Sequence, residues 1–161
     1  MKVKTIVGNG ILAALYIAVS AVIQPFGFTN IQFRVSEIFN HLIVFNKKYL
    51  FGIILGVFLT NLFFSPIAAY DIIFGVGQSL VASLITILTS KYIRKIYLRM
   101  VVNTLVFTVT MFFIAIELHL ALHLPFLLTW LTTAVGEFVV MAVGAPIMYF
   151  INKHVHFDEI V

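Results

Sequence analysis

Long apolar segments without a charged side chain dominate this sequence. Residues 6–23, 49–70 and 72–90 contain no Asp, Glu, Lys or Arg. The hydrocarbon core of a bilayer is about 30 Å thick, and about 20 residues of α-helix cross it. A chain of 161 residues that is 62% hydrophobic cannot bury this much apolar surface in water. The sequence therefore predicts an integral membrane protein with a single membrane domain over residues 1–161.

Continuous hydrophobicity indicates helices rather than a β-barrel. Helices and closed barrels both satisfy their backbone groups inside lipid, but barrel strands alternate polar and apolar residues. We therefore predict an all-α protein, a compact bundle of six transmembrane helices. The second helix is short and carries Glu37, so we expect its neighbours to shield it from lipid. The expected helices cover about 5–23, 34–46, 49–65, 70–91, 99–119 and 128–152.

The basic residues predict the orientation of this bundle. If the N-terminus is cytoplasmic and the helices alternate, nine of the ten basic residues fall on the cytoplasmic side: Lys2, Lys4, Lys47, Lys48, Lys91, Arg94, Lys95, Arg99 and Lys153. This asymmetry agrees with the positive-inside rule. Both termini are therefore expected in the cytoplasm, and the net charge of +4 requires no nucleic-acid partner. Arg34 is the exception.

The acidic residues show the opposite distribution. Only Asp158 and Glu159 belong to the cytoplasmic tail. An ionisable side chain at the centre of a bilayer costs about 2.5–3.5 kcal/mol, so several of them near one face indicate a polar cavity. Four acidic residues map to the outer half of the bundle or its rim: Glu37, Asp71, Glu117 and Glu137.

Further polar residues are expected at the same depth. In an α-helix Arg34, Glu37 and His41 share one face, either as cavity lining or as a structural ion pair that anchors the helix end. Asp71 also suits a helix N-terminus, where a carboxylate is favourable. The candidate solute-binding side chains are Arg34, Glu37, Asn61, Asp71, Gln78, Asn103 and Glu137.

Other features give weaker indications. His119 and His123 have a spacing that binds metal on a helix, but Pro125 argues against a continuous helix, so we expect interfacial histidines and no metal. Four aromatic residues near the outer mouth could stack on a flat ligand or simply pack: Phe28, Phe33, Tyr70 and Trp130.

The chain carries no motif for an energy-consuming or catalytic reaction. It has no cysteine, no nucleotide-binding P-loop, no G-x-S-x-G and no H-E-x-x-H. We therefore expect no enzyme and no cofactor, but a binding subunit that draws energy from other proteins. On the first helix Ala14, Ala18 and Ala21 form a small-residue face, which either packs inside the bundle or docks another protein.

Four segments together resemble one known family. They are "IQFRVSEIFNHL", "NKKYLFGIILGVFLTNLFFSP", "YDIIFGVGQSLVA" and "TAVGEFVV", in order along nearly the whole chain. They resemble the QueT family, the substrate-binding S components of energy-coupling factor (ECF) transporters that are associated with queuosine precursors. Thr60 and Gln78 depart from the family pattern, which bears on the choice of solute.

The resemblance implies partners as well as a solute. It implies six helices with cytoplasmic termini in membrane lipid, an A-x-x-x-A face at Ala14 and Ala18 that docks the transmembrane coupling subunit, and two cytoplasmic ATPases that supply the work. The implied solute, a 7-deazaguanine base, would present two N–H donors to a carboxylate, with Glu137 and Glu37 as the leading candidates. Its carbonyl would need a donor from Arg34, Asn61, Gln78 or Asn103.

Two questions remain open from the sequence. An aminomethyl form of the base would add a cation and require a second carboxylate, whereas a nitrile form would prefer a neutral donor. The alternative functions are an S component for another flat, nitrogen-rich solute, and a structural or regulatory membrane protein whose outer charges only set its topology.

Overall fold

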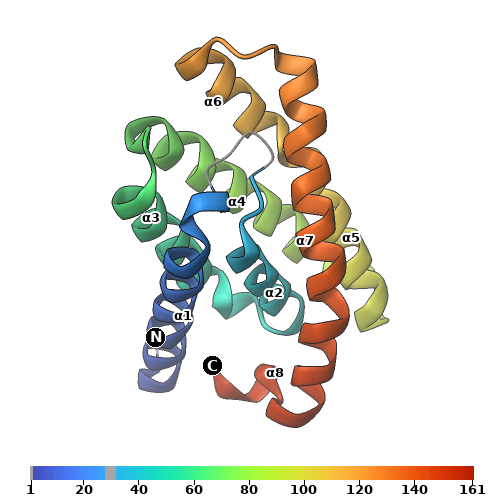
Figure 1. The fold of residues 1–161 in the computed structure, drawn as a ribbon. Coiled ribbons are helices and arrows are strands. Elements are labelled where there is room, and N and C mark those ends of the chain that lie inside the picture. The colour runs from blue at the N-terminus through green and yellow to red at the C-terminus, as the bar shows by residue number, and fades with distance from the viewer. Residues whose placement is uncertain (1, 28–31) are drawn as a thin grey trace.

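The computed structural model describes residues 2–27 and 32–161, and the regular elements in these ranges are all helical (Figure 1). Two of them, η1 and η2, are 3-10 helices. In chain order the elements are α1 (Val3–Gly27), η1 (Val35–His41), α2 (Leu42–Phe45), η2 (Lys47–Tyr49), α3 (Leu50–Phe64), α4 (Ala68–Ser90), α5 (Ile96–Thr110), α6 (Phe112–Leu122), α7 (Phe126–Val155) and α8 (Phe157–Ile160).

Within the described residues, five helical segments are long and apolar enough to cross a membrane. They are Val3–Gln24, Lys47–Phe64, Ala68–Ser90, Ile96–Leu122 and Phe126–Val155. A shorter apolar helix, Val35–Phe45, occupies the place of the second predicted helix. The all-α membrane architecture is therefore confirmed, while six crossings and two cytoplasmic termini stay predictions. The two ends of the chain do lie at the same end of the bundle (Figure 1).

The second predicted helix is not a continuous α-helix. Its first part, η1, is a 3-10 helix, in which side chains three residues apart lie directly above one another. Glu37 and Asn40 have this spacing, and the Asn40 amide donates a hydrogen bond to the Glu37 carboxylate. The α-helical face expected for Arg34, Glu37 and His41 therefore does not form, and each of these side chains finds a different partner.

Helices α1 and α3 pack closely because α3 carries Gly52 and Gly56. A Cβ atom at Gly56 would lie 2.8 Å from the Cβ of Tyr16, and one at Gly52 would lie 2.8 Å from the Asn9 side-chain oxygen. That oxygen accepts a hydrogen bond from the Gly52 amide at 2.6 Å. Small residues four apart allow such close approach of helix backbones in lipid. The contact fixes the position of Tyr16, which reaches into the bundle.

We expect Gly56→Ala to destabilise the bundle. The added methyl group meets the Cβ of Tyr16, which cannot move without the α1 backbone, so a cost of about 1–3 kcal/mol follows from overpacking. The measurement is the Tm of the purified protein in detergent, followed by size-exclusion chromatography after heating. Gly10→Ala is the matched control, because nothing lies within 4 Å of a Cβ at Gly10. Equal Tm values for the two variants would contradict the close contact.

The C-terminal segment folds back over the end of the bundle that holds both termini. Lys48 Nζ donates to the Val161 carbonyl oxygen at 2.9 Å, and the Tyr49 hydroxyl donates to the Phe157 carbonyl oxygen at 2.9 Å. The largest apolar cluster lies here and includes Tyr49, Ile53, Met148 and Val161. This packed end leaves the buried polar side chains to gather further along the bundle.

Candidate solute-binding site

The predicted solute-binding side chains are almost all inside the protein. Arg34 is the most accessible of them, with 10% of its side chain exposed. A buried polar side chain in a membrane protein requires partners, so the next question is which of these residues bond to one another. The fully buried members are Glu37, Asn61, Asp71, Gln78, Asn103 and Glu137.

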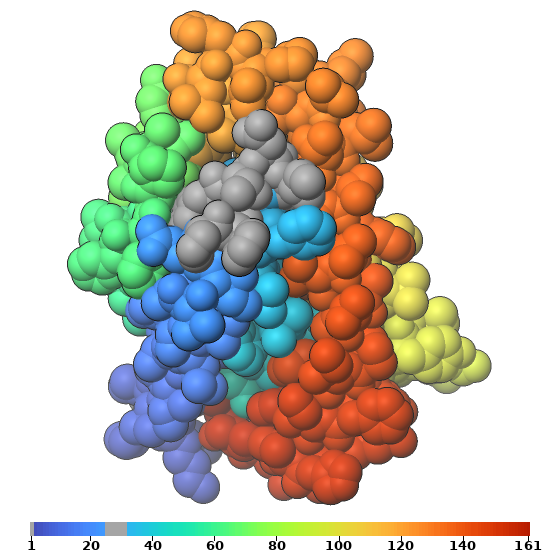
Figure 2. All heavy atoms as spheres, viewed as in Figure 1, coloured from blue at the N-terminus to red at the C-terminus, as the bar shows by residue number. Residues whose placement is uncertain are grey.

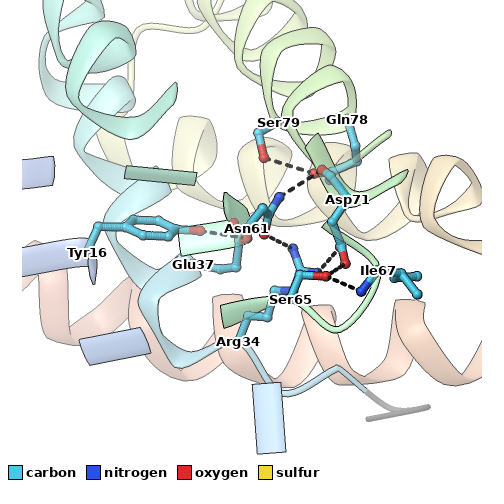
Figure 3. Close-up of polar contacts among 9 residues, drawn as sticks. All are labelled: Tyr16, Arg34, Glu37, Asn61, Ser65, Ile67, Asp71, Gln78 and Ser79. Atoms are coloured by element: carbon cyan, nitrogen blue, oxygen red, sulfur yellow. Dashed lines mark hydrogen bonds and ion pairs between the residues drawn. The ribbon is translucent and has the colours of Figure 1, made fainter. Parts of the chain in front are cut away.

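Arg34 and Asp71 form the centre of one hydrogen-bonded group (Figure 3). Arg34 Nη2 donates to Asp71 Oδ1 at 2.6 Å, and Arg34 Nη1 approaches Asn61 Oδ1 at 3.5 Å. Ser65 Oγ donates to the other carboxylate oxygen of Asp71 at 2.5 Å. Asn61 Nδ2 donates to the backbone carbonyl oxygen of Asp71 at 2.8 Å. The group connects three segments: Arg34 just before η1, Asn61 on α3 and Asp71 on α4. Asp71 therefore serves an ion pair, and α4 has no side-chain cap.

Gly75 makes room for this group, one turn after Asp71 on α4. A Cβ atom there would lie 2.7 Å from Asn61 Nδ2 and 3.7 Å from Arg34 Nη1. Only a residue without a side chain lets the Asn61 amide reach the Asp71 carbonyl oxygen across the helix surface.

Glu37 belongs to a second group and does not pair with Arg34 in the structure. The Tyr16 hydroxyl donates to Glu37 Oε1 at 2.8 Å, and Asn40 donates to Oε2 (Figure 3 shows Tyr16 and Glu37). Arg34 therefore does form an ion pair, as one predicted alternative held, but its partner is Asp71 and not Glu37. His41 turns to α7, where its Nε2–H donates to the Met141 carbonyl oxygen at 2.9 Å.

Gln78 and Asn103 hold helices together and do not bond to the Arg34 group. Gln78 Nε2 donates to Thr110 Oγ1 at 3.0 Å, which links α4 to α5. Asn103 Nδ2 donates to the Asn40 carbonyl oxygen at 3.3 Å, and Asn103 Oδ1 accepts from Thr86 at 2.8 Å. Their amide groups are therefore engaged in hydrogen bonds between helices.

Two buried glutamates have carboxylate oxygens without a hydrogen-bond partner. Glu137 on α7 is 2% exposed and its Oε1 has no partner, while both oxygens of Glu117 on α6 lack one and the residue is 0% exposed. Glu137 lies within electrostatic range of Glu37 and Arg34. Glu117 lies within range of Arg34, and its carboxyl group is close enough to that of Asp71 for the two to share a hydrogen bond. Glu117 is not among the side chains predicted to bind the solute, although a glutamate inside an apolar helix is a detectable indication.

A small pocket lies beside Arg34. It offers about 10 Å³, enough for one water molecule. The Thr60 hydroxyl in its wall is buried without a hydrogen-bond partner. A base-sized solute needs a few hundred Å³, so the pocket in this structure is too small to hold one. The pocket is lined by Tyr16, Ser20, Ile23, Phe33, Arg34, Val35, Ser36, Thr60 and Asn61.

Comparison with known proteins assigns the chain to a family. Residues 6–153 match the QueT transporter family. The chain belongs to this family. The protein named Queuosine precursor transporter QueT from Lactococcus lactis subsp. cremoris (strain MG1363) is 35% identical over 163 residues, which cover 96% of this chain and 95% of that relative. No solved structure matches the chain. The resemblance inferred from the four sequence segments is confirmed, and this QueT family member is a multi-pass protein of the cell membrane.

Other predicted features of this QueT family member have packing or capping roles. His119 Nδ1–H donates to the Leu124 carbonyl oxygen at 2.7 Å, and His123 ends α6 with a positive φ of 55°. The two histidines therefore do not share a continuous helix, as Pro125 indicated. Trp130 packs against Phe112 and Phe126. Tyr70 is 41% exposed, Phe33 lines the small pocket, and Phe28 lies outside the described residues.

The small-residue face of α1 points away from the bundle. Ala14, Ala18 and Ala21 are all exposed, whereas Leu12 and Tyr16 on the other side of the helix are buried. In the space-filling view, α1 (blue) lies at the lower left of the visible face, and α7 (orange to red) runs down its right side (Figure 2). The alanines of this QueT family member therefore take no part in the internal packing against α3, which Gly52 and Gly56 provide.

Proposed function

We propose that the chain is the substrate-binding S component of an ECF importer and that it binds a queuosine precursor, a 7-deazaguanine base. The printed name of its relative and the QueT family assignment support the solute class. The observation that carries the proposal is the buried charged cluster of Arg34, Asp71, Glu117 and Glu137, because such groups inside a membrane bundle indicate a solute path.

The cluster suits a planar base with donors along one edge. A carboxylate accepts two parallel N–H donors, and Arg34 or the Thr60 hydroxyl can donate to a base carbonyl. The basic residues concentrate at the end of the bundle that holds the termini, whereas the Arg34 group lies where α3 ends and α4 begins. With the basic end in the cytoplasm, the site is reached from outside.

An exposed surface on α1 suits a partner subunit. Ala14, Ala18 and Ala21 leave a smooth strip that another helix can approach closely. An apolar groove adjoins it, lined by Ile11 and Leu15 from α1 and by Phe157 and Ile160 from the C-terminal segment. In this proposal the strip docks the transmembrane coupling subunit, and two cytoplasmic ATPases drive delivery of the solute inward.

A binding titration tests the solute class. Purified protein in detergent is titrated calorimetrically with 7-deazaguanines that carry an aminomethyl or a nitrile group, and with guanine, thiamine and riboflavin as other flat, nitrogen-rich solutes. We expect saturable binding of at least one 7-deazaguanine at concentrations where the other solutes give no heat. Preferential binding of another solute would replace the base while keeping the S-component role. A lack of binding throughout the panel would favour a structural role.

A further inference from the structure

The connection between α4 and α5 carries the densest group of basic side chains in the sequence. Four of the ten basic residues fall within nine positions: Lys91, Arg94, Lys95 and Arg99. Within residues 2–27 and 32–161 none of the four pairs with a carboxylate, and the first turn of α5 contains no acidic side chain. The three cations of the connection itself are exposed. The connection therefore presents a concentrated positive charge that the described part of the chain does not offset.

This basic group lies where two apolar segments end. Ala68–Ser90 precedes the connection, and Ile96–Leu122 follows it. Tyr92 and Tyr97 are 88% and 53% exposed, and Lys95 Nζ lies 5.7 Å from the centre of the Tyr97 ring. Exposed tyrosines beside basic residues are typical of the level of the lipid headgroups. The start of α5 (yellow) projects from the lower right of the molecule, so no other part of the visible face covers it (Figure 2).

Hydrogen bonds give the connection a defined shape. Arg99 Nε donates to the Ile93 carbonyl oxygen at 2.6 Å, which closes the connection onto the first turn of α5. At the other end the Tyr92 amide donates to the Thr89 carbonyl oxygen at 3.0 Å and extends the last turn of α4. A surface that is already ordered loses less conformational freedom when it binds a ligand.

An apolar groove runs between α4 and α5, further into the membrane than the basic group. At 1.5 Å per residue, Val102 in its wall lies about 9 Å along α5 from Ile96. The polar layer on each side of a bilayer is about 5–8 Å thick, so the groove begins at about the depth where acyl chains begin. Its volume is about 280 Å³, and it is lined by Ile85, Val102, Leu105, Val106, Val109 and Thr110.

We propose that the α4–α5 connection and this groove together bind one phospholipid with a negatively charged headgroup. Lys91, Arg94 and Lys95 attract the headgroup, and one acyl chain lies in the groove. Basic residues between the ends of two spans suit such headgroups, and each cation near the membrane surface adds to the attraction. A zwitterionic lipid fills the same groove, but its own ammonium group offsets its phosphate, so the cations select the anionic lipid. The inference does not depend on the transported solute.

Lipid binding to the purified full chain tests this proposal. The wild-type protein in neutral detergent is mixed with phosphatidylglycerol or with phosphatidylcholine of the same acyl chains. Bound lipid is counted by native mass spectrometry, and the Tm is recorded across the titration. We expect phosphatidylglycerol to bind at least about tenfold more tightly and to raise the Tm as it saturates the site. Glycerophosphoglycerol, the same headgroup without acyl chains, should bind at least about tenfold more weakly than the lipid.

A triple variant tests the headgroup half of the site. Replacing Lys91, Arg94 and Lys95 with glutamine should lower the affinity for phosphatidylglycerol at least about tenfold, to that for phosphatidylcholine. The matched control removes three exposed cations elsewhere at the same end of the bundle and should keep the preference. It replaces Lys2, Lys4 and Lys47 with glutamine.

A single variant tests the groove. Val102→Phe places a larger side chain in the groove and leaves all cations in place. We expect the affinity for phosphatidylglycerol to fall about tenfold, as the loss of about two buried methylene groups gives. Val143→Phe adds the same bulk at a valine of α7 that is 58% exposed, and it should leave lipid binding unchanged.

The other possible results contradict the proposal. Equal binding of the two lipids to the wild-type protein, or an unchanged preference in the α4–α5 triple variant, leaves these cations with a role in orientation alone. An equal loss in both triple variants means that the overall charge of this end attracts the lipid. Glycerophosphoglycerol that binds as tightly as the lipid, or an unaffected Val102→Phe, excludes the groove as the acyl-chain site. None of these results bears on solute binding, so the proposed function is tested separately.

Discussion

Replacing Arg34 with alanine is expected to abolish detectable solute binding and to destabilise the protein. The side chain donates to Asp71 at 2.6 Å, and Asp71 is 1% exposed. Removal of one member of a buried ion pair leaves the other charge uncompensated, at a cost of about 3–5 kcal/mol. The variant also removes the only guanidinium near the free carboxylates within the described residues. We expect at least a hundredfold loss of affinity, or about 3 kcal/mol, by calorimetry.

A double variant separates the loss of stability from the loss of binding. Arg34→Met together with Asp71→Asn removes both charges while it keeps the volume of the two side chains. We expect its Tm to recover most of the loss seen in Arg34→Ala, since the double variant does not leave Asp71 as a charge without its partner, while binding stays undetectable. Arg94→Ala is the control, because Arg94 lies in the connection between α4 and α5. Solute binding by the double variant at wild-type affinity would mean that the Arg34–Asp71 pair is purely structural.

The membrane architecture could be predicted because it depends on composition over whole segments. Long apolar stretches predicted six helices, and five of these coincide with the five spans, whose ends agree with the structure to within a few residues, as for 70–91 against Ala68–Ser90. The predicted 99–119 helix extends to Ile96–Leu122 and contains a break at Met111, where α5 ends and α6 begins. A break at one residue between two apolar stretches does not change the hydrophobicity of the segment, so the sequence pattern could not predict it.

The partners inside the site could not be predicted because they depend on which helices become neighbours. Spacing along one segment suggested Arg34 with Glu37, but Arg34 bonds to Asp71, 37 residues further along the chain. The 3-10 form of η1 also removed the α-helical alignment on which that expectation rested. Sequence identified these residues as buried charges, and the packing of α3 and α4 selected their partners.

Residue type alone did not separate binding groups from structural ones. Gln78 and Asn103 are as buried as Glu137, yet their amides form hydrogen bonds between elements. Gln78 links α4 to α5, and Asn103 links α5 to η1. The sequence places Glu117 in the outer half of the bundle with other acidic residues, but it does not show that this side chain is fully buried with no protein donor on either oxygen. The role assigned to each of these residues in solute binding stays a proposal.

Ala18→Leu is expected to abolish solute uptake and to leave solute binding unchanged. Ala18 is exposed on the flank of α1 that faces away from α3, and a leucine there projects into the strip proposed to dock the coupling subunit. Close backbone approach between helices in lipid fails when a small interface residue becomes large. We expect the coupling subunit and ATPases no longer to co-purify with the variant, and uptake of labelled base by cells to fall at least tenfold, as a loss of about 1.4 kcal/mol in docking would produce.

Two comparisons make this result specific. Ala142→Leu adds the same volume at an exposed alanine of α7 and should retain both co-purification and uptake, because lipid accommodates the larger side chain. Calorimetry on the isolated Ala18→Leu protein should give the wild-type affinity, since the alanine strip lies on the opposite side of α1 from Tyr16 and its bond to Glu37. Normal uptake in Ala18→Leu would exclude this strip as the docking surface, and an equal loss in Ala142→Leu would show that any added bulk on the outer surface impairs the transporter.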